Sequence, residues 1–128
     1  MLGKYNRYRV LKVFLDAPTE QFRLREISRM SQISPPSVMN YLTAFEKEGV
    51  IQKHIKRGIP FYVAVRDHRD FVFYKKMSIL FELHVSGLVD YLWDKLSPEA
   101  IILYGSSARG ESTEHSDIDL FIIGKERS

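Results

Sequence analysis

Two apolar runs around a polar segment constrain the fold of this 128-residue chain more than any other feature of its sequence. The runs cover residues 100–104 and 117–123, and glycine, serine and arginine are prominent between them. Apolar runs of this length next to glycine favour strands, and their nearly continuous hydrophobicity predicts that both strands are buried. We expect a loop with a short helical turn between them. In the second run, Ile118 and Leu120 are expected to point into the core.

The segment between the runs contains a motif. Residues 105–120 read GSSARGESTEHSDIDL. This motif resembles the nucleotidyltransferase superfamily that includes DNA polymerase β, in its minimal form: a strand, Gly-Ser, a short helix with Ala-Arg-Gly, and Ser-Asp-x-Asp on the next strand. The resemblance spans residues 83–124. It implies a partial α/β nucleotidyltransferase-like unit that takes a nucleoside triphosphate (NTP) together with Mg²⁺.

The chemistry of the motif residues fits that resemblance. Gly105 lets the backbone approach a phosphate closely, and Ser106 with N–H groups at a helix start can cradle the phosphate. Asp117 and Asp119 stand two apart on an expected strand, so both carboxylates face the same way. Such a pair holds Mg²⁺, which bridges triphosphate oxygens and offsets charge in the transition state. Arg109 either contacts a phosphate or pairs with a nearby acid to fix the loop.

The motif lacks one acidic group of the superfamily. Catalytically complete members place a third carboxylate on a later strand, and only nine residues follow Asp119 here. Glu111 and Glu114 lie in the loop and not on an adjacent strand. We therefore expect an incomplete, non-catalytic unit, which is either a piece of a longer enzyme or a protein that has lost turnover.

The charge of the chain is unevenly distributed. Residues 1–66 contain 12 Lys and Arg against 5 Asp and Glu, a net charge of +7, whereas residues 67–128 contain 7 against 11, a net charge of −4. A basic half joined to an acidic half suggests two separate tasks, with a polyanion as the partner of the basic half. An unevenly charged solvated surface is the alternative.

The basic half has the element order of a winged helix-turn-helix. Helical spacing of apolar residues predicts three helices, and two β-rich runs around a turn follow them. In chain order these elements cover residues 4–16, 24–30, 35–47 and 50–65. Ser34 is the expected N-cap of the third helix and Gly49 its end. Residues 24–66 resemble MarR/ArsR-type winged helix-turn-helix regulators, which implies that the third helix enters the major groove of double-stranded DNA and the hairpin reaches the backbone or minor groove.

The outward face of the third helix and the hairpin supply the candidate DNA contacts. Asn40 can pair with adenine, and Arg57 beside Gly58 suits a narrow minor groove. No Arg or Lys precedes Lys47 on that face, so guanine readout by arginine is not expected. A protein–protein or dimer module is the alternative. The candidate DNA-binding residues are Ser34, Pro36, Ser37, Asn40, Tyr41, Lys53, Lys56 and Arg57.

Residues 68–96 predict a long helical stretch that is apolar on more than one face. One stripe follows a three/four spacing and further apolar residues lie off it, so the helix needs more than one surface to bury it. Gly87 is a candidate break. We expect this stretch to form a homodimer. The stripe consists of Tyr74, Met77, Phe81, Val85, Leu88 and Leu92.

Composition excludes several classes of protein. Cysteine is absent, which excludes a disulfide scaffold and a thiolate zinc site. No run of about 18 apolar residues predicts a membrane span, and no signal peptide is recognisable, so a cytoplasmic protein without membrane contact is expected.

Together these features predict an α+β chain with three parts. A winged helix-turn-helix covers residues 1–66, a connecting and dimerising helix 67–96, and the front part of a nucleotidyltransferase-like domain 97–128. The predicted function is a DNA-binding transcriptional regulator whose incomplete module binds NTP or Mg²⁺. The alternative is a nucleotidyltransferase that transfers a nucleotidyl group from NTP–Mg²⁺ to a hydroxyl acceptor, with the winged helix docking the substrate. A toxin–antitoxin component that uses the module to contact a partner is also compatible with the sequence.

Overall fold

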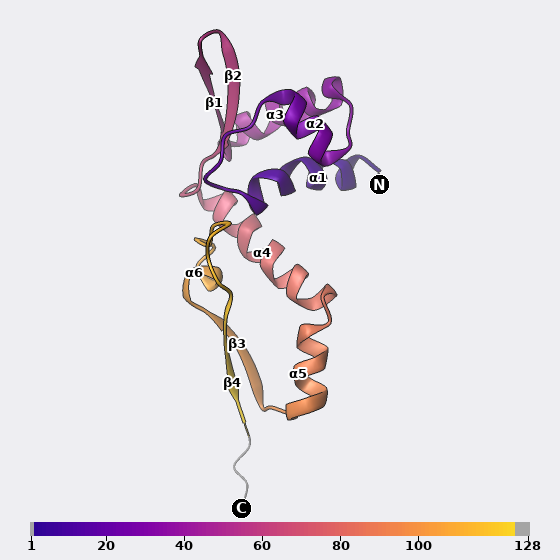
Figure 1. Cartoon of the computed structure of the whole chain (residues 1–128), viewed down its shortest axis with the longest axis vertical. Coiled ribbons are helices and arrows are strands. Elements are labelled where there is room, and N and C mark those ends of the chain that lie inside the picture. The colour runs from indigo at the N-terminus through magenta and orange to yellow at the C-terminus, as the bar shows by residue number, and fades with distance from the viewer. Residues whose placement is uncertain (1, 125–128) are drawn as a thin grey trace, which may run out of the picture. The chain divides into compact units, whose positions relative to one another are not determined.

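A computed structural model describes residues 2–124, and the chain divides after Phe71 into two compact units. Each unit combines helices with a small antiparallel sheet (Figure 1), which confirms the predicted α+β class. No helix among the described residues is long and apolar enough to cross a membrane. The unit boundary lies in the first turn of a helix, so most of the expected connecting stretch belongs to the second unit.

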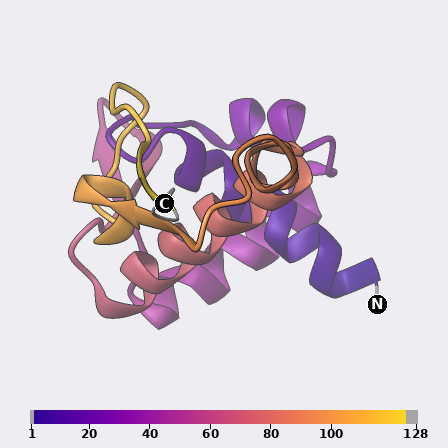
Figure 2. The same ribbon diagram turned by 90° about the horizontal axis from the view of Figure 1, so that it is seen from below.

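The first unit begins with three helices that group together (Figures 1 and 2). They are α1 (Leu2–Asp16), α2 (Leu24–Ser31) and α3 (Pro35–Glu48). All three start and end within two residues of the predicted positions. Gly49 ends α3 at a φ of 88°, a left-handed conformation that glycine adopts without strain. Ser34 precedes α3 as predicted, but its hydroxyl does not cap the helix and instead donates to Ser37 Oγ at 3.1 Å.

The core of the first unit lies between these helices. Val38, Leu42 and Phe45 on α3 are fully buried. Phe14 on α1 meets Phe22 edge-to-face, with ring centroids 5.6 Å apart. Each large apolar side chain buried in this way stabilises the fold by roughly 1.5–3 kcal/mol. The helices therefore share a core with Phe22 and with the buried hairpin residues Ile51 and Tyr62, and this core holds α3 in place.

A β-hairpin completes the first unit. Strands β1 (Ile51–Lys56) and β2 (Ile59–Ala64) pair antiparallel from Ile51 opposite Ala64 to Lys56 opposite Ile59. Phe22 adds an isolated bridge to Tyr62 on the other side of β2. The turn consists of Arg57 and Gly58 alone, with φ of 52° and 76°. Positive φ at both positions defines a type I′ turn, whose twist matches that of the flanking strands.

The helices of the second unit are interrupted where the sequence placed a candidate break. Helix α4 (Arg69–Val85) and helix α5 (Leu88–Leu96) are separated at Gly87, which has a φ of 81°. A single helix over residues 68–96 is therefore not formed. On α4, Ile79 and Leu83 are buried, whereas Met77 and Phe81 from the predicted stripe are about half exposed. The helix is apolar on two faces, as predicted, and the unit buries one of them.

The sheet of the second unit pairs the two predicted runs. Strand β3 (Ala100–Tyr104), the one-turn helix α6 (Gly105–Ala108) and strand β4 (Asp119–Ile123) follow one another, and β3 pairs antiparallel with β4. The prediction that both strands are buried is wrong. Ile102 and Phe121 stand opposite each other and are 43% and 57% exposed, because nothing among the described residues covers that face. Ile118, expected in the core, precedes β4 and is half exposed.

Candidate nucleic-acid interface and candidate nucleotide site

The outward face of α3 is polar and accessible. Pro36 and Asn40 are exposed on the side opposite the buried stripe, at the helical spacing that the sequence predicted. Thr43 lies on the same side and was missed, because a lone threonine on a helix gives no binding signal. Its hydroxyl donates to the Met39 carbonyl at 2.9 Å. This face presents small polar side chains suited to base edges.

Tyr41 differs from the other predicted contacts on α3. Its hydroxyl donates to the carbonyl of Gly3 at 3.3 Å, and the residue is half-buried. This bond joins α3 to α1, so Tyr41 lies toward the helix bundle rather than at the centre of the outward face. Ser34 and Ser37 lie at the start of α3 and bond to each other.

The predicted basic residues of the hairpin present their side chains at different places on it. Lys53 and Lys56 are three residues apart on β1, so their side chains leave opposite faces of the ribbon. Lys56 Nζ donates to Gln21 Oε1 at 2.8 Å and lies 5.8 Å from the centre of the Phe61 ring. Arg57 stands at the tip of the hairpin, where the turn exposes it. The tip and the strand thus offer two separate cationic positions.

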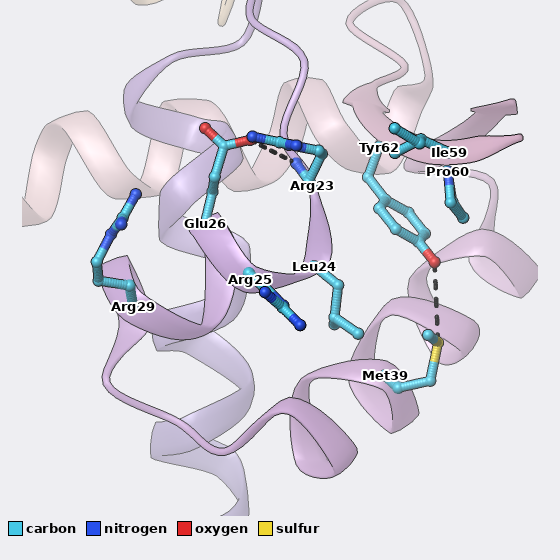
Figure 3. A pocket seen from close by; sticks show the side chains of 9 residues that line it. All are labelled: Arg23, Leu24, Arg25, Glu26, Arg29, Met39, Ile59, Pro60 and Tyr62. Atoms are coloured by element: carbon cyan, nitrogen blue, oxygen red, sulfur yellow. Dashed lines mark hydrogen bonds and ion pairs between the residues drawn. The ribbon is translucent and has the colours of Figure 1, made fainter. Parts of the chain in front are cut away.

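A groove opens between α2, α3 and β2, and no sequence pattern predicts it. Figure 3 shows its nine lining residues, with Arg25 extending into the space between α2 and α3. The cavity volume is about 490 Å³. Arg25 and Arg29 form no ion pair within residues 2–124, whereas Arg23 pairs with Glu26 at 3.4 Å. The lining residues are Arg23, Leu24, Arg25, Glu26, Arg29, Met39, Ile59, Pro60 and Tyr62.

The buried ring of Tyr62 forms part of this groove. Its hydroxyl donates to the sulphur of Met39 at 3.8 Å (Figure 3). Burial, and to a lesser degree the charge of Glu46, raises the pKa of Tyr62 above its usual value. The phenol therefore stays neutral at physiological pH and adds no negative charge to the groove.

The nucleotidyltransferase motif brings a carboxylate against a helix start. Gly105 begins α6 with a φ of 74°. A Cβ atom at this position would lie 2.8 Å from Asp119 Oδ2, closer than such contacts allow. Only glycine therefore permits the carboxylate to stand over the first turn of α6, next to Ser106. Asp119 is the first residue of β4, and the exposed Asp117 precedes the strand rather than lying in it as predicted.

The loop between α6 and β4 is held by close packing and local bonds. Arg109 Nε pairs with Glu111 Oε2 at 2.9 Å, and both side chains are mostly exposed. Gly110 has a φ of 71°, and a Cβ there would lie 2.6 Å from the Val72 carbonyl oxygen on α4. Glycine at 110 thus allows the loop to lie directly against the helix backbone. Arg109 occupies the loop-fixing position that was one of its two expected roles.

The two aspartates fit a cation that arrives with a nucleotide. Within the described part of the chain, no three acidic or histidine side chains are grouped to hold a metal ion. Mg²⁺ is commonly bound through one or two carboxylates, with substrate phosphates and water completing its shell. Asp119 presents a hard oxygen ligand beside Gly105. Asp117 and Asp119 are the groups of the motif that would hold Mg²⁺ if it arrived with a triphosphate.

Comparison with protein families found one match in each half of the chain. Residues 8–54 match the IclR helix-turn-helix domain, and residues 85–128 match the nucleotidyltransferase domain. Each match spans about a third of the chain. The chain thus contains a helix-turn-helix DNA-binding domain followed by a nucleotidyltransferase domain, which confirms the predicted fusion. The MarR/ArsR-type detail is not confirmed, since the matched type is IclR. Neither the curated proteins nor the solved structures gave a match.

Proposed function

We propose that the chain is a DNA-binding transcriptional regulator whose nucleotidyltransferase module binds NTP with Mg²⁺ but does not turn it over by itself. The observation that supports this most directly is the incomplete acidic set. Asp117 and Asp119 are present at the motif, and no third acid joins them within residues 2–124. The first unit, in contrast, has an accessible polar face on α3 and a basic hairpin, which together suit duplex DNA.

On DNA, α3 lies in the major groove with Asn40 and Ser37 toward base edges. Asn40 discriminates adenine through its two hydrogen-bonding groups. Arg57 at the hairpin tip enters the adjacent minor groove, where a narrow A·T-rich segment concentrates negative potential. Lys53 and Lys56 neutralise phosphates, so affinity falls steeply as salt rises.

At the nucleotide site, Asp117 and Asp119 would hold a Mg²⁺ ion that arrives with an NTP. Such an ion would offset negative charge on the triphosphate. Gly105 allows the Asp119 carboxylate to approach the start of α6, and Ser106 would supply a hydroxyl to a phosphate. Arg109 keeps the loop in place through Glu111. A further carboxylate would be needed to take the proton of an attacking hydroxyl, and its lack among the described residues supports binding without transfer.

The exposed apolar stripe of α4 supports a homodimer. Phe73, Met77, Leu80 and Phe81 are all about half exposed. A second copy fits best, because an uncharged stripe is complementary to itself about a two-fold axis.

Fluorescence anisotropy with a labelled duplex tests the DNA-binding part. The parent protein is expected to bind, with an affinity that falls steeply between 50 and 200 mM salt, and Asn40→Ala is expected to reduce sequence preference. Asp94→Ala on α5 serves as the control. The absence of binding at low salt would overturn the regulator proposal.

Calorimetric titration of NTP–Mg²⁺ tests the nucleotide part. Binding is expected in the parent protein and is expected to be lost in Asp117→Asn/Asp119→Asn, because the cation loses its protein ligands. Gly105→Ala is expected to weaken binding as well, since its methyl group displaces the Asp119 carboxylate. Binding unaffected by all three substitutions would contradict the proposed site.

A transferase is the second candidate, and the intact contact between Gly105 and Asp119 favours it. In that case a nucleotidyl group passes from NTP–Mg²⁺ to a hydroxyl acceptor that the winged helix docks. Labelled NTP incubated with candidate acceptors decides between the two functions. Transfer that disappears in Asp117→Asn/Asp119→Asn would replace the regulator proposal with this one.

Sedimentation velocity tests the homodimer. The parent protein is expected to sediment as a dimer, and Met77→Glu as a monomer, because a buried unpaired carboxylate is costly. Asp94→Lys, a charge change outside the stripe, is expected to stay dimeric. A monomeric parent protein at micromolar concentration would exclude the proposed interface.

A further inference from the structure

We propose that the exposed face of the β3–β4 sheet binds the nucleobase of the NTP, which stacks on the ring of Phe121 and is held by stacking alone. This inference rests on the proposed NTP–Mg²⁺ binding and deepens it, because it names the surface that receives the uncharged end of the ligand. Its basis is the register of the face with Asp119, its exposure and its apolar lining.

The sheet register places the exposed face on the same side as the carboxylate of Asp119. Side chains two apart on a strand point to one face, so Phe121 lies on the side of Asp119. The register pairs Tyr104 with Asp119 and Ile102 with Phe121, which adds two side chains of β3 to this face. Two residues along a strand span about 7 Å. The ring of Phe121 therefore follows the carboxylate along one continuous surface.

This face is more accessible than the opposite one. Ile102, Tyr104 and Phe121 are all about half exposed. The side chains between them, Leu103 and Leu120, point to the other face and are less exposed. The exposed apolar surface thus begins at the candidate metal ligand and extends away from it, in the direction that a base takes when the phosphates lie at Asp119.

The carboxylate at the end of the face favours a ligand that carries a cation. Asp119 forms no ion pair within residues 2–124. A protein surface that covered the whole face would enclose this carboxylate without a counter-charge, which is costly. An NTP–Mg²⁺ complex brings the cation with it. Its polarity also matches the face, since its phosphates are charged and its base presents a flat ring surface.

The lining predicts stacking without readout of the base edges. Ile102, Phe121 and Ile123 carry no side-chain hydrogen-bonding group, so they offer no donor or acceptor that distinguishes one base from another. Every base has a π-face, and stacking on an aromatic side chain tolerates any of them. Purines have the larger ring system and are expected to bind somewhat more tightly than pyrimidines.

Calorimetric titration with two matched ligands tests the base contact. Each protein is titrated with ATP–Mg²⁺ and with tripolyphosphate–Mg²⁺, which has the phosphate chain without a nucleoside. The parent protein is expected to bind ATP roughly tenfold more tightly than tripolyphosphate. Phe121→Leu is expected to lose this difference and Phe121→Tyr to keep it, because the ring provides the stacking. Tyr91→Leu on α5 is the control, since Tyr91 is as exposed as Phe121, and it is expected to match the parent protein.

Nuclear magnetic resonance of the bound ATP gives a readout that is independent of affinity. An aromatic ring shifts the signals of nuclei above its face upfield. The base protons of ATP are therefore expected to shift upfield on binding to the parent protein and to Phe121→Tyr, and not on binding to Phe121→Leu.

The proposed function and the base contact fail in different ways. If neither ligand binds the parent protein, the proposed nucleotide binding fails. If both ligands bind equally well and Phe121→Leu changes neither affinity nor the base signals, the stacking face is wrong and binding of the Mg²⁺-bound phosphates stands. A Phe121→Leu protein that binds ATP as the parent protein does, but sediments as a monomer where the parent is a dimer, would assign the face to a second copy instead.

Discussion

The two units bury their apolar side chains to very different extents. In the first unit, Phe14, Ile27 and Phe45 are wholly buried in a core that the unit builds from its own helices. In the second, α5 has no buried residue, and one face of the β3–β4 sheet is exposed. The comparison teaches that the first unit buries its largest apolar side chains, whereas the second unit leaves apolar side chains of α5 and of one sheet face exposed.

The largest effect is expected in the core of the first unit. Phe14→Ala is expected to lower its free energy of unfolding by about 3–5 kcal/mol, because it removes a buried ring and leaves a cavity beside Phe22. Urea unfolding followed by amide NMR signals of α1–α3 measures the change. The fluorescence of Trp93, the only tryptophan, reports the second unit and is expected to keep its midpoint.

The matched change in the second unit is Phe121→Ala. Phe121 is 57% exposed, so its removal is expected to cost less than about 1.5 kcal/mol. Equal losses for Phe14→Ala and Phe121→Ala would show that the second unit is as well packed as the first and would break the comparison.

The next largest loss of stability is expected at Gly110, where the loop of the second unit lies directly against α4. Gly110→Ala is expected to cost about 3 kcal/mol, because alanine is strained at positive φ and its methyl group meets the Val72 carbonyl. Gly87→Ala has a similar φ but open space around it, so strain alone of about 1–2 kcal/mol is expected. Trp93 fluorescence in urea measures both. Equal effects of the two substitutions would contradict the packing argument.

A smaller effect on the stability of the first unit is expected at high pH, where Tyr62 ionises. The pKa of Tyr62 is raised on folding, so the folded state holds its proton more tightly than the unfolded state does. The resulting stability is present below the unfolded pKa of about 10 and is lost as the pH rises through the folded pKa. Between pH 10 and 12, the thermal midpoint of Tyr62→Phe is expected to fall less than that of the parent protein.

The control for this pH dependence is Tyr5→Phe, since Tyr5 is exposed. Its thermal midpoint is expected to follow the parent protein at every pH. If Tyr62→Phe does so too, ionisation of Tyr62 does not contribute to alkaline unfolding.

The smallest effect is expected at the exposed ion pair of the motif loop. Arg109→Ala is expected to change the stability of the second unit by less than about 1 kcal/mol, because solvent screens the pair with Glu111. NTP–Mg²⁺ titration of the same variant assigns its role. A tenfold loss of affinity at unchanged stability would mean that Arg109 binds phosphate rather than fixing the loop.

Local sequence signals predicted the elements well. Pro35 and Gly49 bound α3, and Gly58 marks the hairpin turn, because these residues act on their own backbone. The motif likewise predicted β3, α6 and β4, and the approach of Asp119 to Gly105 explains why that position requires glycine.

What the sequence did not predict depends on contacts between distant residues. The groove at Arg25 exists only where α2 meets β2, and Tyr41 turns toward α1 through a bond to Gly3. The prediction that β3 and β4 are buried was wrong, because an apolar run predicts a strand but does not predict which residues cover it. Asp117 fell outside β4 because pairing with β3 ends at Tyr104 opposite Asp119.

At the tip of the hairpin, a single residue affects both the stability of the turn and the proposed contact with DNA. Type I′ turns favour asparagine before glycine, because asparagine tolerates positive φ better than other residues with a side chain. Here the position holds Arg57 at a φ of 52°. An asparagine at this site would relieve backbone strain and remove the tip cation in the same step. If Arg57 contacts DNA as proposed, the hairpin tip combines a cation for DNA with a less favourable turn, and thermostability selections run without DNA present would tend to replace the arginine.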